Sequence, residues 1–305
     1  MAFARQIGHG PRRAAVLLAF GALSACSYAY VTPDFTTAAK NMDPATFECC
    51  ADPEKFYPPG LTELALTLGN ALGPTASQLV YGDYEESEYP GLLTGKTAAH
   101  ADIVRRLDPF DILLISNHSY QIGRLMPGRF SHSLVYIGTE GELRAAGLWS
   151  HPALVPYRDD IRAGKTLMEA AWPDVHLIEP HKAFETDQVL LMRPRLSASE
   201  KRAAFARMFS VMGKPFNFTL GIDPTAESFA CTGLVDYGMP ELGFTHREVY
   251  GQTVVMPDDV AAQAVRDDKL DFIAYVAGTE DGYKLRSEYA LMVELAAYWG
   301  VPGQE

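Results

Sequence analysis

Three residues of this sequence have side chains suited to nucleophilic catalysis and lie in segments that would position them for it. Cys231 lies in the stretch FACTGLVDYG, where a helix is expected to begin. A thiol at a helix N-terminus lies at the positive end of the helix dipole, which favours the thiolate that a nucleophile needs. His132, on the strand-like run FSHSLVYIG, would accept the proton of this thiol. Glu169, on a neighbouring strand, would orient the other nitrogen of the imidazole.

A structural interpretation of the same residues also exists. A buried cysteine often behaves as a small hydrophobic residue, a histidine in a sheet is often simply hydrogen-bonded, and a glutamate is most often a surface charge. For an isolated pair of Cys and His this interpretation would be the better one. The order and the predicted positions of Cys231, His132 and Glu169 together favour a catalytic site.

The elements that must position these residues are predicted from hydrophobic periodicity. Short apolar runs indicate strands at residues 112–115, 133–137, 165–171, 188–192 and 270–276. The loops between the runs are too short for repeated helical crossovers, which favours an antiparallel sheet over a doubly wound parallel one. The sequence therefore predicts an α+β fold.

Helices are predicted from apolar spacing and from capping signals. The clearest one opens at the capping box Ser197-Ala198-Ser199-Glu200 and is stopped by Gly213 and Pro215. The other expected helices cover residues 61–72, 98–107, 231–237 and 287–299, and a short one begins at Pro257.

The order of these motifs resembles a known family. A strand, a Ser-His that opens the next strand, a Glu on a later strand and a Cys that opens a helix resemble the circularly permuted NlpC-type papain-like hydrolases, in particular YiiX-like and YebB-like proteins. The resemblance covers residues 108–259, with a Gly-Lys-Pro-Phe stretch before Cys231 and a Met-Pro-Asp-Asp stretch after its helix. The sequence departs from these relatives at Thr232-Gly233, where they usually carry Ser-Glu.

The resemblance implies a circularly permuted papain-like fold in which an antiparallel sheet packs on helices. It implies Cys231 as the nucleophile, His132 as the base and Glu169 as the third, polar member. Attack of the thiolate on an amide or ester carbonyl would give a thioester, which water hydrolyses with the help of His132. The leading expectation is an amidase or peptidase acting on cell-wall peptide or a small amide. The alternatives are a lipid-directed acyltransferase or thiol esterase and a non-catalytic envelope binding protein.

Composition and charge limit the partners. The chain of 305 residues is 48% hydrophobic and 21% charged, as is usual for a globular protein, and its formal net charge is −12. The sequence has no basic cluster, and a negative net charge repels a polyanion, so we expect no nucleic-acid partner. We expect no cofactor and no metal, since the candidate ligands His176, Glu179 and His181 have no companion cluster.

The N-terminus has the features of a signal peptide. Arg5, Arg12 and Arg13 precede a short apolar stretch, which ends in Leu23-Ser24-Ala25-Cys26 and resembles the lipobox of lipoprotein precursors. An ordinary secretory peptide is the alternative. We expect residues 1–25 to be removed and Cys26 to carry the lipid, at the periplasmic face of the cell envelope. Ser27, rather than an Asp, favours the outer membrane.

Lipidation of Cys26 leaves three cysteines in an oxidising compartment. Adjacent Cys49 and Cys50 would form a vicinal disulfide, pair elsewhere or belong to a metal site, and Cys231 is then the natural free thiol. The expected domains are a signal peptide (1–25), a tether with a helical extension (26–95), the hydrolase domain (96–260) and a C-terminal extension (261–305). His118, Tyr120 and Arg124 are expected beside the cleft, and Trp149 and Trp172 in packing positions.

Overall fold

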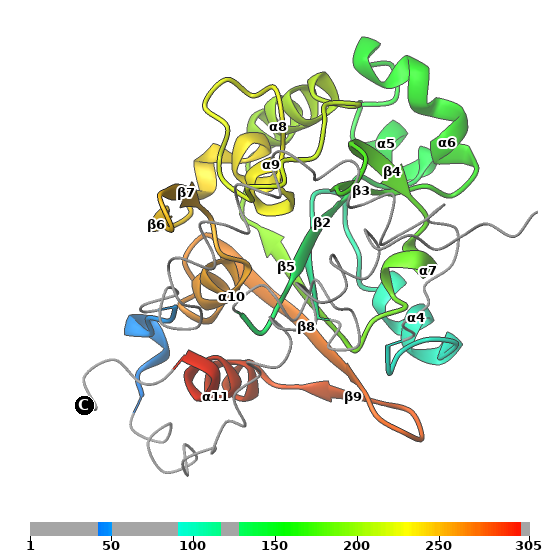
Figure 1. Ribbon diagram of the computed structural model, residues 1–305. Coiled ribbons are helices and arrows are strands. Elements are labelled where there is room, and N and C mark those ends of the chain that lie inside the picture. Colours follow the sequence, from blue (N-terminus) through cyan, green and yellow to red (C-terminus); the bar gives the residue numbers. More distant parts are fainter. Residues whose placement is uncertain (1–41, 51–90, 117–127, 300–305) are drawn as a thin grey trace, which may run out of the picture.

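The computed structural model describes residues 42–50, 91–116 and 128–299 of the chain (Figure 1). Several predicted features lie outside the described residues: the signal peptide (1–25), the lipidated Cys26, the helix at 61–72, and His118, Tyr120 and Arg124. Among the helices that are described, none has the length and apolar character needed to cross a membrane.

A seven-stranded sheet forms the centre of the fold, with the strand order β4-β3-β2-β1-β5-β8-β9. All neighbouring strands in it are antiparallel, which confirms the predicted α+β class with an antiparallel sheet. Its strands are β1 (Ile112–Ser116), β2 (His132–Tyr136), β3 (Leu167–Ala170), β4 (Val175–Ile178), β5 (Gln188–Pro194), β8 (Leu270–Gly278) and β9 (Tyr283–Arg286).

Helices cover both faces of this sheet, so its central strand β1 is buried on both sides. Alternate residues of a strand point to opposite faces. Ile112 and Leu114 accordingly join the core that contains residues of α8 (Ala198–Ser210), α9 (Cys231–Gly238), α10 (Pro257–Val265) and α11 (Glu288–Trp299). Leu113 instead joins a second core with α4 (Thr97–Val104) and α7 (Pro180–Ala183). This double burial explains why the strand sequence is continuously apolar.

The capping box predicted at the start of α8 is present in the structure. The Ser197 side chain accepts a hydrogen bond from the Glu200 backbone N–H, and the Glu200 carboxylate accepts one from the Ser197 backbone N–H. These contacts satisfy N–H groups that a helix start leaves without an intrahelical partner.

The C-terminal segment completes the central sheet rather than extending away from it. Strand β8 pairs with β5 from Gln188↔Ala277 to Pro194↔Leu270, and Leu291 and Trp299 of α11 are buried in the main core. Strand β8 and helix α11 therefore share the sheet and the main core with the segments that carry Cys231 and His132. The periodicity of apolar residues predicts that residues 270–276 form a strand, but it does not predict the strand with which they pair.

Several short elements were not predicted because they span too few residues for a periodic pattern. They include the two-stranded sheet of β6 (Arg247–Val249) and β7 (Gln252–Val254), and the helices α5 (Glu140–Ala145) and α6 (Arg158–Arg162).

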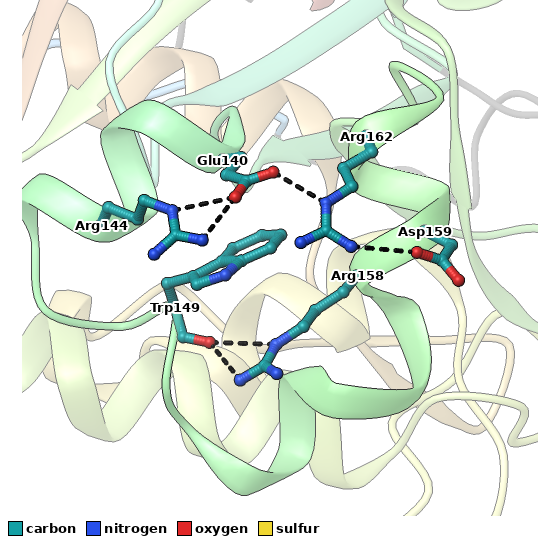
Figure 2. Close-up of polar contacts among 6 residues, drawn as sticks. All are labelled: Glu140, Arg144, Trp149, Arg158, Asp159 and Arg162. Atoms are coloured by element: carbon teal, nitrogen blue, oxygen red, sulfur yellow. Dashed lines mark hydrogen bonds and ion pairs between the residues drawn. The ribbon is translucent and has the colours of Figure 1, made fainter.

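Trp149 lies in the loop that follows α5, inside a group of arginines (Figure 2). The guanidinium carbons of Arg144, Arg158 and Arg162 lie 5.2, 5.4 and 5.2 Å from the centre of its ring. Arg144 and Arg162 both bind the Glu140 carboxylate, which holds the two guanidinium groups in place. The indole is only 6% exposed, so this side chain packs within the protein and offers no open surface to a substrate.

Candidate active site

His132 and Glu169 lie on neighbouring antiparallel strands at the end of the sheet where β2 begins. The register pairs Val135 of β2 with Met168 of β3 and Tyr136 with Leu167. This register brings the two functional side chains to the same region of the sheet, where His132 Nε2 lies 2.6 Å from Glu169 Oε2. Both side chains are largely buried, with 21% of the His132 side chain and 12% of the Glu169 side chain exposed.

Cys231 is the first residue of α9, as predicted from the sequence. Helix α9 packs against β2 and β3, and the thiol, which is 5% exposed, forms a side-chain hydrogen bond with His132. Because Nε2 of His132 faces Glu169, Nδ1 is the ring nitrogen left for the thiol. The structure therefore brings together the three residues that the sequence singled out.

The electrostatics of this group favour an ion pair. Burial alone would raise the pKa of the Cys231 thiol, but the charge of His132 and its hydrogen bond lower the pKa below its usual value. Burial would lower the pKa of His132, whereas its contacts with Cys231 and Glu169 raise it to about 10. Burial would raise the pKa of Glu169, whereas its two histidine neighbours lower it to about 2. The shifts of all three pKa values favour the charged forms, a thiolate, an imidazolium and a carboxylate, over the neutral ones.

The chain on both sides of Cys231 is fixed by hydrogen bonds. Before Cys231, the Phe229 N–H donates to the Pro215 carbonyl, and the Phe229 carbonyl accepts from the Asn217 N–H. After it, the Thr232 hydroxyl donates to the Val255 carbonyl at 2.7 Å. Thr232 thus anchors the first turn of α9.

The start of α9 leaves backbone donors beside the thiol. Ala230, the residue before the helix, is extended and has no side chain that can cap it. The first N–H groups of a helix have no intrahelical acceptor, so without a cap they remain available to a negatively charged oxygen. An oxyanion formed by attack of Cys231 on a carbonyl would lie near these donors.

Sequence reasoning missed Ser133 as a member of this site. It is the residue after His132 and is 1% exposed. Its backbone and side chain both contribute to the lowered pKa of the Cys231 thiol, after the larger effect of His132. Within the described part of the chain its hydroxyl has no hydrogen-bonding nitrogen or oxygen. Alternate residues of a strand point to opposite faces, so a strand pattern alone does not place the consecutive residues His132 and Ser133 beside the same thiol. In the structure α9 packs against β2, and Cys231 forms hydrogen bonds with both residues.

The metal-ligand candidates of the sequence are not brought together. His176 contacts Glu169, whereas the Glu179 carboxylate lies 3.6 Å from the Lys182 ammonium and His181 is exposed on α7. In the described ranges, the side chains close enough to share an ion are Cys49, Cys50 and Asp259. The two sulfurs of that group are joined in a disulfide, and the Asp259 carboxylate is bound by Arg247.

A pocket of about 200 Å³ borders another side of α9. Ala230, Gly233 and Tyr237 contribute to its wall, and Cys231 does not. Residues 230, 233 and 237 follow the helical repeat, so they define a face of α9 different from the one that carries Cys231.

No protein-family model matches this chain, and searches of curated proteins and of solved structures gave no significant match.

Proposed function

We propose that this protein is a cysteine hydrolase of the cell envelope, with a circularly permuted papain-like fold, which cleaves an amide bond through a thioester on Cys231. The observation that carries the proposal is the chain of contacts from the Cys231 thiol through His132 to Glu169. The direction of each pKa shift supports the proposal, because it favours the charged form that such a reaction uses.

The proposed reaction proceeds in two steps. The Cys231 thiolate attacks the carbonyl carbon, and the backbone N–H groups at the start of α9, which no side chain caps, stabilise the oxyanion that forms. His132 gives its proton to the leaving amine, which departs as the thioester forms. Water then attacks the thioester, with His132 as the base, and releases the acid and the free thiol. Glu169 orients the imidazole and stabilises its positive charge.

Labelling of the thiol by iodoacetamide tests this proposal. The rate at which the peptide containing Cys231 is modified would be followed by mass spectrometry across pH, for the full-length protein and for His132→Ala. We expect modification of the wild type near neutral pH, because the pKa of the thiol is lowered. We expect His132→Ala to lose most of it, because burial then acts on the thiol without a compensating cation.

Cys231→Ala serves as the control for modification elsewhere in the chain. Cys49 and Cys50 are paired in a disulfide and do not react with the reagent. A wild-type Cys231 that is as inert as the thiol of His132→Ala would contradict the hydrolase proposal and favour the non-catalytic binding protein.

A lipid-directed acyltransferase or thiol esterase is the second candidate, and a cluster of aromatic side chains favours it. The ring centres of Trp172 and Phe218 lie 5.4 Å apart, and those of Phe216 and Phe218 lie 5.2 Å apart. All three side chains are partly exposed. The Phe216 N–H donates to the Pro173 carbonyl, and the segment also pairs with Phe229, so the cluster joins the strand region of Glu169 to the chain that enters Cys231.

Hydrolysis of matched substrates separates the two candidates. A series of p-nitrophenyl esters with acyl chains of increasing length would be compared with peptide p-nitroanilides. An esterase for acyl chains would prefer the longer esters and lose that preference in Phe218→Ala, because an aromatic surface binds apolar chains. If the protein is instead an amidase or peptidase, it should hydrolyse the anilides. The rate of ester hydrolysis should then depend little on the length of the acyl chain.

The anchoring of the protein is a separate proposal, which rests on Arg12, Arg13 and the sequence Leu23-Ser24-Ala25-Cys26. We propose cleavage before Cys26 and acylation of this residue, with the mature protein held at the periplasmic face of the outer membrane. Metabolic labelling with a radioactive fatty acid tests it: the wild type should incorporate label and fractionate with membranes, whereas Cys26→Ser should do neither.

A further inference from the structure

A second histidine lies on the far side of Glu169. In the β3–β4 hairpin, Glu169 pairs directly with His176. The Nε2 atom of His176 lies 3.2 Å from Glu169 Oε1, while the other carboxylate oxygen, Oε2, lies 2.6 Å from His132 Nε2. Each oxygen of the carboxylate therefore faces one imidazole.

The contacts of His176 determine where its protons are. Its Nδ1 atom lies 2.8 Å from the backbone carbonyl of Asp174, which can only accept a hydrogen bond, so Nδ1 carries a proton. An ionised Glu169 carboxylate can also only accept, so Nε2 carries a proton as well. An imidazole ring with both nitrogens protonated is a cation. The other acidic group at this ring, the Asp174 carboxylate, lies 3.4 Å from Nδ1 and favours the same state.

The charges of the whole group then balance. In the ion-pair state that the proposed reaction uses, the Cys231 thiolate and the Glu169 carboxylate are negative, and His132 and His176 are positive. Without His176, two negative charges would share one cation in a largely buried site, which is unfavourable in a medium of low dielectric constant. The carboxylate would then also have a free oxygen, and rotation of its side chain would no longer be opposed by a second hydrogen bond.

We infer that His176 is a positioning residue of the proposed active site: it holds Glu169 by a charge-assisted hydrogen bond, so that Oε2 stays directed at His132. The inference rests on the proposed function of Cys231 and His132. His176 does not touch the reacting atoms, and it acts through the orientation of Glu169. It extends the site to four residues in the order Cys231, His132, Glu169 and His176.

The test is the pH profile of Cys231 modification in His176→Ala, measured with iodoacetamide and mass spectrometry on the full-length protein. We expect the rate near neutral pH to fall about tenfold, the scale of one hydrogen bond to a charged group. We also expect the acidic limb of the profile to move to higher pH, because a misdirected Glu169 stabilises the His132 imidazolium less well.

A conservative variant separates positioning from an effect on folding. The side-chain nitrogen of Gln occupies roughly the place of His Nε2 and donates to a carboxylate, so His176→Gln should restore most of the lost rate. His181→Ala is the matched control, since His181 is exposed on α7, and it should leave the profile unchanged.

Three results would overturn the inference. The first is an unchanged profile in His176→Ala while the wild type reacts and His132→Ala does not; the proposed function would then stand without this residue. The second is a shift of the acidic limb to lower pH, since His176 would then merely compete with His132 for the charge of Glu169. The third is a defect in His176→Gln as large as in His176→Ala. An inert wild-type Cys231 would instead overturn the proposed function itself, and this inference with it.

Discussion

The thiol of Cys231 depends on its neighbours for its charge, because burial opposes ionisation. The cation on His132 reverses the effect of burial, and Glu169 keeps the proton on that cation. This is a coupled system in which the loss of one charge changes the protonation of the others. Substitutions that preserve the shape of a side chain but remove its charge therefore test the chemistry better than truncations do.

Glu169→Gln is the most informative of these substitutions. The amide oxygen can still accept a hydrogen bond from His132. The negative charge of Glu169 is gone, however, and with Cys231, whose effect is larger, it raises the pKa of His132 to about 10. The pKa of His132 should fall and the pKa of the Cys231 thiol should rise. We expect the acidic limb of the labelling profile to move upward by about one pH unit or more, and an identical profile would exclude Glu169 from the site.

Ser133→Ala probes the hydroxyl beside the thiol. The side chain of Ser133 lowers the pKa of Cys231, and its hydroxyl has no nitrogen or oxygen partner within the described ranges. Removing it should raise the pKa of the thiol slightly and slow labelling near neutral pH about threefold, with unchanged thermal stability. Ser131→Ala, two residues earlier on the same segment, provides the comparison.

At the scale of elements, α10 holds the chain that leads into β2. Asp258, in the first turn of α10, accepts hydrogen bonds from the N–H groups of Arg129 and Phe130 at 2.6 and 2.8 Å. It also accepts one from the indole of Trp299 in α11 at 2.6 Å. These bonds fix the chain just before His132, so the buried Asp258 carboxylate helps to determine where β2 begins.

Asp258 also gives stability a pH dependence. Burial, only partly offset by these hydrogen bonds, raises the pKa of Asp258 to about 6. A carboxyl group whose pKa is higher in the folded state than in the unfolded state stabilises the fold below both values. That stability is lost as the pH rises from about 4 towards 6. We expect Asp258→Asn to remove this slope in urea unfolding experiments at different pH.

The same variant should be less stable than the wild type at pH 5 by about 1–3 kcal/mol, because the amide nitrogen cannot accept the bonds that a carboxylate oxygen accepts. Asp223→Asn is a comparison on an exposed loop, where the carboxylate also accepts backbone bonds but its pKa is lowered to about 2. An unchanged slope in Asp258→Asn would mean that other groups determine the pH dependence.

Much of this arrangement could be predicted from the sequence, and the reasons why the rest could not are physical. Strand β1, helix α8 and the positions of Cys231 and His132 follow from local patterns such as an apolar run and a capping box. The contact of Asp258 with Phe130 joins residues 128 positions apart, and no local pattern encodes it. The role of His176 depends on the β3–β4 register, which a sequence of four-residue strands does not specify.

At the scale of the whole molecule, residues 42–50 form a strap that belongs to the folded body. The side chain of Phe47 and the Cys49–Cys50 disulfide are buried against it. Arg266 donates to the Phe47 carbonyl at 2.9 Å, and Arg247 donates to the Cys49 carbonyl at 2.8 Å. The strap precedes the described body by many residues in sequence, yet it is bound by Arg247 of β6 and by Arg266, the residue that follows α10.

Arg247 is the residue on which this docking depends most, since it joins three segments. Its guanidinium binds both oxygens of the Asp259 carboxylate, at 2.6 and 2.8 Å, as well as the Cys49 carbonyl. Asp259 is only 5% exposed. In Arg247→Ala this carboxylate would be buried without a partner, and such a loss costs about 3–5 kcal/mol. We expect a corresponding decrease in the free energy of unfolding.

Release of the strap should also expose the disulfide. In the wild type at neutral pH, buried Cys49 and Cys50 should resist a water-soluble phosphine reductant for as long as the protein stays folded. In Arg247→Ala the two thiols should be reduced and alkylated faster under the same native conditions. Arg162→Ala is the control, because this arginine is half-exposed and its ion pairs on the surface contribute about 1 kcal/mol or less. Equal reduction rates in Arg247→Ala and in the wild type would show that the strap is held by the packing of Phe47 and not by the arginine.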